Sequence, residues 1–299
     1  MKIVWITLLL VVSLVAQETK DSKNIDFDTP VDNETKDSLQ KWAESSFNLE
    51  PYKVNYILPY AYAFDEYSVT IPFAKYKQTE AQLQISLKLK VGEDWLGLDE
   101  SYYLAYSHKA FWQIYAYSSP FRETNYNPEA FVVFPVTEDT GDFHLRSIKV
   151  AFAHISNGEP DTSSEDINGV EFENISRGLN YIYTAATLQH SFAYGILVSE
   201  WTLRAPVLLN SGTSENDDIM DYYGYTKVKF SYFHKKHLAT LMLMGNPVEG
   251  HGAMQMTYSY PIFDSFINLY GSFFTGYGES LIDYNHDVTK VAVGFSFSH

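Results

Sequence analysis

The stretch LQISLKLKV, residues 83–91, decides the fold class, because the character of its side chains changes at every second position. Leu, Ile or Val occupies each odd-numbered position, and Gln, Ser or Lys occupies each even-numbered one. Successive side chains of a strand point to opposite faces, so this alternation predicts a β-strand with one apolar and one polar face. Residues 225–233 and 290–298 repeat the pattern.

Segments of this kind follow one another from residue 51 onward, with turn signals such as HKKH and GNPVEG between them. An even number of roughly ten-residue strands, ending in an aromatic strand, is typical of a transmembrane β-barrel. We therefore expect an all-β protein with a single antiparallel transmembrane β-barrel of about 12 strands over residues 51–299. A soluble β-sandwich is the alternative. The segments span residues 51–63, 79–91, 100–116, 127–137, 141–156, 175–188, 190–204, 221–234, 236–246, 251–261, 265–276 and 287–297.

The N-terminus indicates the compartment. Lys2 precedes the apolar run IVWITLLLVVSLVA (3–16), after which the chain becomes polar. A short basic start, an apolar stretch and a small final residue predict a secretory signal peptide over residues 1–16. The run is shorter than the about 20 apolar residues that a membrane-spanning helix needs. Residues 17–50 are acidic and polar, and we expect a leader with one possible short helix there.

The composition excludes several classes of function. The chain has 37 Asp and Glu residues against 21 Lys and Arg, a net charge of −16, whereas a nucleic-acid-binding protein needs a basic surface. The absence of Cys excludes disulfides, a cysteine zinc site and a thiol nucleophile. The G-x-S-x-G, H-E-x-x-H, P-loop and dinucleotide-binding motifs are also absent from the sequence. We expect no nucleic-acid partner.

One pair of residues, His154 and Ser156, has side chains that could act in catalysis. In KVAFAHISNG, His154 and Ser156 share a strand face with Val150 and Phe152, and a base and a nucleophile placed in this way could form a hydrogen bond. In a membrane barrel the apolar face contacts lipid, so the pair would lie on the outer wall and its substrate would be a lipid. An H-x-S pair arises by chance about once in a chain of this composition, so it does not by itself identify an enzyme.

Four longer stretches give the pair its context. They are SSPFRETNYNPE (118–129), HISNG (154–158), SRGLN (176–180) and GYGESLIDYN (276–285). On these stretches the chain resembles outer membrane phospholipase A, a family of twelve-stranded barrel lipases. The resemblance implies a serine hydrolase of the bacterial outer membrane, a calcium-dependent phospholipase A1/A2 that cleaves acyl esters of phospholipids and lysophospholipids and is activated as a homodimer.

The resemblance also implies roles for single residues. Ser156 would be the nucleophile and His154 the general base, and Asn180 would orient the imidazole as Asp does in the familiar triad. Asn180 has the same strand parity as Ile182, which is consistent with a place on the outward face. The backbone N–H of Gly158 would stabilise the oxyanion.

Calcium is the cofactor that the family uses. By resemblance its ligands would be the carbonyl of Glu159, the hydroxyl of Ser176 and the carbonyl of Ser118 from the partner subunit, with Asp161 as the nearby carboxylate. Calcium prefers six to eight oxygen ligands, and these groups are of that type. Ser164, in the extra segment 162–175, is an alternative metal hydroxyl. The distance from Ser176 to Asn180 in SRGLN favours Ser176.

Three positions depart from the family's pattern or stay open. Glu159 stands where the family often has Arg, which a carbonyl ligand tolerates. His108 replaces a Gln of the family's dimer interface, so the strength of the dimer is open. Glu215 lies near the family's second calcium site and is left outside the primary set.

The sequence leaves two alternative functions open. A non-enzymatic barrel, a porin or an adhesin, would use His154, Ser156 and Asn180 only as rim residues, and ion conductance would distinguish it. A barrel lipid A deacylase is a third possibility, against which the long SSPFRETNYNPE stretch argues. Inward polar residues such as Gln84, Lys88, Lys227 and Lys229 would fill part of the narrow lumen of twelve strands.

Overall fold

The computed structural model describes residues 49–67, 76–136, 143–159, 174–207, 216–262 and 267–297. The barrel belongs to one compact unit that begins at Glu50. The expected signal peptide and leader, apart from the last residues of the leader, lie outside the described residues. So do Asp161, Ser164 and Glu215.

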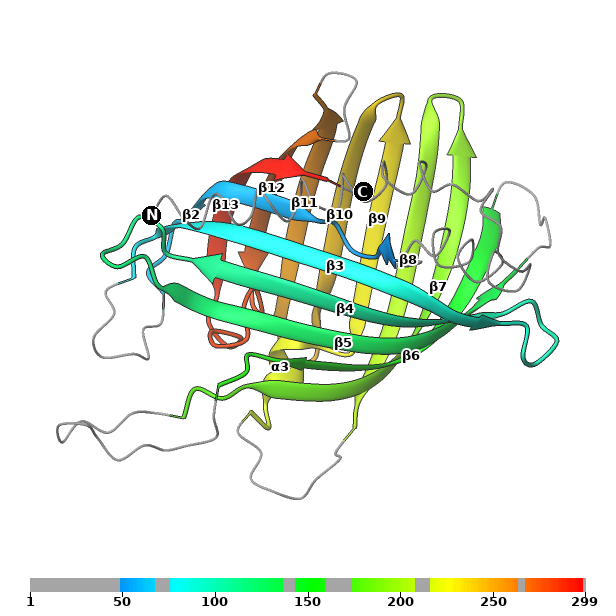
Figure 1. The fold of residues 1–299 in the computed structure, drawn as a ribbon, viewed down its shortest axis with the longest axis horizontal. Helices are drawn as coiled ribbons and strands as arrows, with labels where there is room; N and C mark the ends of the chain where they lie inside the picture. The colour runs from blue at the N-terminus through cyan, green and yellow to red at the C-terminus, as the bar shows by residue number, and fades with distance from the viewer. Residues whose placement is uncertain are drawn as a thin grey trace, which may run out of the picture. The chain divides into compact units, whose positions relative to one another are not determined.

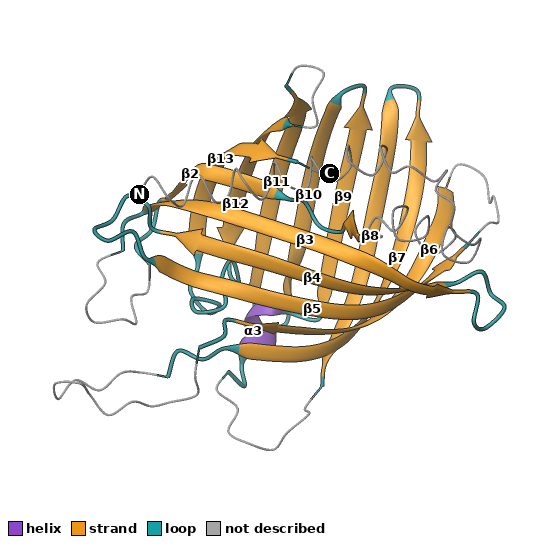
Figure 2. Ribbon diagram, in the orientation of Figure 1, coloured by secondary structure: helices purple, strands orange, loops and turns teal. Residues whose placement is uncertain are grey.

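Twelve antiparallel strands form a closed barrel, as the alternating sequence predicted (Figures 1 and 2). Each strand pairs with the next along the chain, and β13 closes the ring by pairing with β2. A short additional strand, β1 (Leu49–Pro51), pairs with β3. The barrel strands are β2 Tyr56–Ala63, β3 Thr79–Glu93, β4 Ser101–Trp112, β5 Phe121–Pro135, β6 Phe143–Ser156, β7 Gly178–Phe192, β8 Gly195–Pro206, β9 Thr226–His234, β10 His237–Asn246, β11 His251–Pro261, β12 Asn268–Gly276 and β13 Val288–Ser296.

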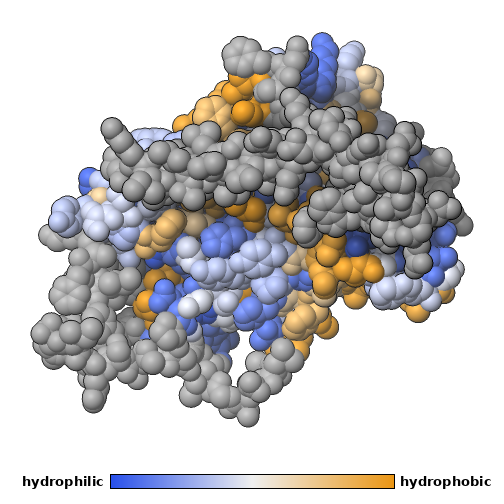
Figure 3. Space-filling view, in the orientation of Figure 1, coloured by the Kyte–Doolittle hydropathy of each residue, from blue (hydrophilic) through white to orange (hydrophobic). Residues whose placement is uncertain are grey.

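The outer wall is apolar because each strand exposes every second side chain. On β6, Val150 and Phe152 are 43% and 40% exposed, while Ala151 and Ala153, which alternate with them, are buried inside the barrel. Where grey atoms do not cover the surface, Figure 3 shows groups of orange apolar side chains beside blue and pale ones. An outward apolar face is the arrangement of a barrel that contacts lipid. None of the described helices is long and apolar enough to cross a bilayer.

Four predicted strand starts were wrong by five or six residues. Of these, β2 begins at Tyr56 instead of residue 51, and β8 begins at Gly195 instead of residue 190. The segment predicted from residue 221 begins instead with a short helix, α3 (Ile219–Tyr223), and the strand begins at Thr226. The helix forms because Met220 and Tyr223 are buried in an apolar cluster with Leu281. The strand predicted from residue 127 begins already at Phe121, so most of the SSPFRETNYNPE stretch lies in the wall.

The barrel has two distinct ends. The connections β6–β7, β8–β9 and β12–β13 lie at one end, which we call the long-loop end, and the two-residue connections 193–194 and 235–236 lie at the other. Outer-membrane barrels place long loops outside the cell and short turns in the periplasm. Because β6 ends and β7 begins at the long-loop end, the HISNG and SRGLN segments meet there.

The inside of the barrel is filled by polar contacts. Tyr52 and Lys53, which precede β2, lie inside the ring, where Lys53 Nζ is 2.5 Å from Glu129 Oε1 and donates to Asn127 Oδ1 at 2.6 Å. Arg122 donates to Glu80 at 3.0 Å and to Asp283 at 2.8 Å, and all three side chains are buried. Further ion pairs join Lys290 to Glu80 and Glu279.

Candidate active site

The structure brings His154 and Asn180 together. They face each other in the register of β6 and β7, and the distance between His154 Nδ1 and Asn180 Oδ1 is 2.8 Å. An amide oxygen can only accept a hydrogen bond, so His154 donates from Nδ1. In the neutral tautomer this leaves Nε2 with a lone pair, which is the form that a general base needs.

Ser156 stands two residues beyond His154 and directly across from Gly178. A Cβ atom at position 178 would lie 3.8 Å from both the Ser156 Cβ and the His154 Cε1. Glycine at this position therefore leaves open space beside the hydroxyl and the imidazole. Across the described ranges no hydrogen bond joins the Ser156 hydroxyl to His154. Catalytic hydrogen bonds are often long without substrate and shorten in the complex.

All three residues lie on the outer wall. His154 and Ser156 have the parity of the exposed Val150 and Phe152, and Asn180 has that of Ile182, which is 51% exposed. The site is thus on the lipid-facing surface at the long-loop end of the barrel. An acyl chain in the membrane could reach it without leaving the apolar phase.

Gly158 follows Ser156 after one residue and has φ +74°. This conformation is readily adopted by glycine and disfavoured for other residues. In addition, a Cβ atom here would lie 2.8 Å from Tyr126 Cε2, closer than carbon atoms approach without displacement. Tyr126 faces Ser156 in the register of β5 and β6. Both the turn and the Tyr126 ring therefore require glycine at position 158.

Asn157 joins the two active-site segments. Its side chain, 3% exposed as a residue, donates to the carbonyl of Ile175 at 2.7 Å and accepts from the N–H of Arg177 at 3.0 Å. The same oxygen also accepts from the N–H of Glu159 at 3.3 Å. Its backbone N–H donates to the Arg177 carbonyl at 3.0 Å. Asn157 therefore fixes Glu159 relative to the segment that carries Ser176.

The residues expected to hold calcium fit that ion in donor chemistry. Glu159 and Ser176 lie on the two segments that Asn157 connects, and Ser118 lies in the β4–β5 turn at the same end of the barrel, with φ +63°. Carbonyl and hydroxyl oxygens are hard donors of the kind that calcium prefers. Among the described residues no cluster of three or more His, Cys, Asp or Glu side chains could hold a metal.

The segment before α3 supports β7 from the loop side. Asn216 accepts from the Gly178 N–H at 3.2 Å and donates to the Gly178 carbonyl at 2.8 Å. Tyr284 donates to Asp218, and its ring lies 5.9 Å from the Arg177 guanidinium. Burial, and then this hydrogen bond to the carboxylate, raise the pKa of the Tyr284 hydroxyl well above its ordinary value, so it remains a neutral donor.

His108 lies on the same outward row as the site. Its ring meets Tyr126 edge to face, with 5.0 Å between the centroids, and Tyr126 in turn faces Ser156. His108 is half-buried in the single chain. A continuous row therefore runs from His108 to Gly178 across three neighbouring strand pairs.

Sequence reasoning missed the supporting residues. Asn157 and Tyr126 lie inside stretches that carried the resemblance. The sequence therefore pointed to their neighbourhood, but it did not predict what these two residues do. Asn127, which donates to the His154 carbonyl at 2.7 Å, also lies in one of these stretches, and its role was not predicted either. For Asn216 the acidic loop sequence SGTSENDD gave no signal.

Comparison with known proteins identifies the family of the chain. The phospholipase A1 family model matches residues 32–297. A phospholipase A1 of Escherichia coli is 31% identical over 84% of this chain and 82% of its own length. A putative phospholipase A1 of Neisseria meningitidis is 33% identical over 76% of this chain, which spans only 56% of that relative.

Solved structures match as well. Outer membrane phospholipase A of E. coli has 30% identity and a TM-score of 0.73, covering 85% of this chain and 93% of that one. An active-site mutant of it, with alanine in place of an asparagine, has the same TM-score. The enzyme of Salmonella typhi, solved as a dimer with bound calcium, also has a TM-score of 0.73 and covers the same shares of both chains.

The fold and the comparisons together define the class, a phospholipid ester hydrolase built as a β-barrel of the bacterial outer membrane. The chain belongs to the phospholipase A1 family.

Proposed function

We propose that this protein is a calcium-dependent phospholipase A that hydrolyses acyl esters of phospholipids and lysophospholipids at the outer wall of its barrel. The observation that carries the proposal is the 2.8 Å contact between His154 and Asn180, on an exposed apolar face and beside Ser156. A water-soluble substrate would have to enter the lipid phase to reach this face, whereas membrane lipids contact it directly.

The chemistry follows from the residues present. His154 Nε2 removes the hydroxyl proton of Ser156 as its oxygen attacks the ester carbonyl carbon. Asn180 holds the imidazole through Nδ1–H and keeps Nε2 directed at the serine. His154 then returns the proton to the leaving alcohol as the ester bond breaks. In the second half, His154 removes a proton from a water whose oxygen attacks the acyl carbon, and it returns that proton to Ser156 Oγ as the fatty acid leaves.

Negative charge develops on the carbonyl oxygen during both steps. The backbone N–H of Gly158 is the proposed donor to that oxygen, and the turn geometry at Gly158 supports its role. The carbonyl of Glu159 and the hydroxyl of Ser176 would hold calcium, with Asp161 as the nearby carboxylate. When bound there, calcium would supply positive charge next to the same oxygen.

We further propose that dimerisation activates the enzyme, because Ser118 of the partner subunit would complete the metal site. The enzyme of S. typhi was solved as a dimer with bound calcium. The position of His108 on the outward row beside the site supports a partner on this wall.

Fatty-acid release from phospholipid and lysophospholipid in detergent micelles tests the proposal. Wild type should be active with calcium and inactive with chelator, and Ser156→Ala should lose activity by at least about a thousandfold. Ser147→Ala is the matched control, because Ser147 lies near the opposite end of the same strand. Equal activity of Ser156→Ala and wild type would rule out this nucleophile.

Comparison of crosslinked dimers with monomers held apart by dilution in detergent tests the activation. Calcium should support activity only in the dimer. Full calcium-dependent activity in the monomer would rule out a ligand from the partner subunit.

A further inference from the structure

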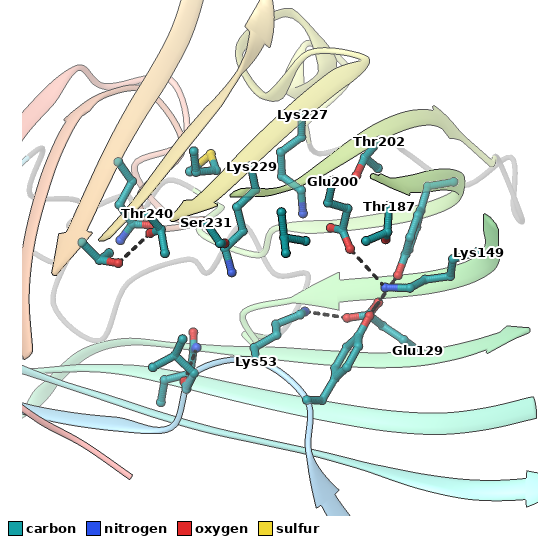
Figure 4. A pocket seen from close by; sticks show the side chains of 18 of the residues that line it. Lys53, Glu129, Lys149, Thr187, Glu200, Thr202, Lys227, Lys229, Ser231 and Thr240 are labelled. Atoms are coloured by element: carbon teal, nitrogen blue, oxygen red, sulfur yellow. Dashed lines mark hydrogen bonds and ion pairs between the residues drawn. The ribbon is translucent and has the colours of Figure 1, made fainter. Parts of the chain in front are cut away.

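A polar cavity of about 440 Å³ lies inside the barrel, on the opposite side of the wall from the active site. Side chains from β2 to β12 and from the segment that precedes β2 line it, and Figure 4 labels those from β5 to β10 together with Lys53. The volume is large enough for a small polyatomic ion together with several waters. Catalysis at Ser156 uses none of the charged groups in this cavity.

The lining is strongly cationic. Six Lys and Arg side chains face two carboxylates, Glu129 and Glu200, although the protein as a whole has a net charge of −16. Each carboxylate already has a partner within salt-bridge distance. Lys53 Nζ lies 2.5 Å from Glu129, and Lys149 Nζ lies 3.5 Å from Glu200. Positive charge therefore remains uncompensated within the lining.

Lys227 and Lys229 carry part of that charge. They occupy alternate positions of β9 and both point into the cavity (Figure 4). Lys229 faces Glu200 in the register of β8 and β9, but that carboxylate is paired with Lys149. Throughout the ranges that the structure describes, neither ammonium has a hydrogen bond or an ion pair. Both lysines are half-buried, so their ammonium groups face the cavity without an anionic partner of their own among the described residues.

Hydroxyl groups also line the cavity. Ser231 follows Lys229 on the same face of β9, and Thr187 and Thr240 line the cavity from neighbouring elements (Figure 4). A site with two ammonium donors and several hydroxyl donors suits a tetrahedral oxyanion, which offers acceptors in several directions. A carboxylate-lined cavity would instead suit a cation.

We propose that the barrel lumen contains a binding site for a small oxyanion of the phosphate type, held between Lys227 and Lys229. The phosphate could be free inorganic phosphate or a phosphate monoester such as glycerol 3-phosphate. Both share the doubly charged tetrahedral group that the lysines and hydroxyls recognise. The site is independent of the phospholipase chemistry, because the wall of the barrel separates the two.

Equilibrium dialysis with radiolabelled inorganic phosphate tests the site on the refolded full chain in detergent, without calcium and at low ionic strength. Wild type should bind one equivalent in a saturable way. The double substitution Lys227→Gln and Lys229→Gln should weaken binding by about tenfold for each ammonium removed. The substitutions Lys235→Gln and Lys236→Gln, in the turn between β9 and β10, remove the same charge and should leave binding unchanged.

Further measurements distinguish the two candidate anions and control for the folding of the variants. Competition by glycerol 3-phosphate shows whether the monoester binds more tightly than the free ion. Lys229→Arg keeps the charge and should retain binding, and heat-modifiable electrophoretic mobility verifies that each variant is folded. Absence of saturable binding of both anions to wild type would overturn the proposal. So would equal binding by the folded Lys227→Gln/Lys229→Gln variant.

Discussion

At the scale of single residues, the site depends on groups that do no chemistry. Two side-chain hydrogen bonds of Asn157 join the segment after Ser156 to the segment before Gly178, and a third, from the Glu159 N–H, holds the turn within the first segment. Tyr126 fills the space beside Gly158, so that only glycine fits the turn. These contacts fix the distance between proposed calcium ligands that are far apart in sequence.

Asn157→Ala should impair catalysis more than folding. The substitution leaves the Ile175 carbonyl and two N–H groups without their partner, which costs on the order of 1–3 kcal/mol for each group that stays buried. We expect a higher calcium concentration for half-maximal activity, measured by calcium titration of fatty-acid release. Asn157→Asp keeps the acceptor oxygen and should lie between Ala and wild type. An unchanged calcium requirement in Asn157→Ala would contradict this role.

Asn180→Ala should lower kcat by on the order of a hundredfold with little change in KM, because the imidazole loses the acceptor that orients it. Asn180→Asp retains an oxygen at the same position and should recover most of the activity. Steady-state kinetics of the two variants check this. A loss that is equal in Ala and Asp would show that the amide nitrogen, not the oxygen, is required.

At the scale of elements, the alternation of side chains predicted the strands well because burial on one face imposes a period of two. The strands β6 and β11 end where the sequence indicated. The helix α3 was missed because five residues are too few for a helical period to show, and tertiary packing against Leu281 decides its conformation.

Leu281→Ala should destabilise the long-loop end of the barrel. Leu281 is 0% exposed and packs with α3, so its truncation leaves a cavity and should cost about 2–5 kcal/mol of unfolding free energy. Leu243→Ala on β10 is the control, because Leu243 is 41% exposed and lipid can fill the space. Urea unfolding followed by tryptophan fluorescence measures both. A cost for Leu281→Ala no larger than that for Leu243→Ala would refute the packing argument.

At the scale of the whole molecule, polar contacts cross the inside of the barrel beside the cavity of about 440 Å³, among the residues that the structure describes. Tyr52 and Lys53 enter the ring and bond to Glu129, and buried ion pairs connect Arg122 to Glu80 and Asp283. This arrangement disfavours the porin that the sequence had left open, because a porin needs a water-filled channel.

Planar-bilayer recordings check this directly. The refolded protein should show no steady conductance steps, since polar side chains and the entering segment occupy the lumen. A porin of known conductance inserted in the same bilayer is the positive control. Stable, voltage-independent steps from the wild-type protein would contradict a filled lumen.

The sequence predicted the candidate site in part. Parity predicted that His154 and Ser156 share a face, and the resemblance supplied Asn180, which the register of β6 and β7 places across from His154. The bond to Asn180 joins residues 26 positions apart, so no local pattern could reveal it. Asn216 acts on Gly178 from another loop, 38 positions away, and only the closed fold brings them together.

Covalent labelling tests the central claim, a nucleophilic serine on the lipid-facing wall, most directly. The chain would be treated in mixed micelles with a fluorophosphonate carrying a long alkyl chain, and the modified peptide would be identified by mass spectrometry. We predict a single modification at Ser156, formed much faster with calcium than with chelator and abolished in His154→Ala. Modification of another serine, or a rate at Ser156 no faster than in the unfolded protein, would contradict the account.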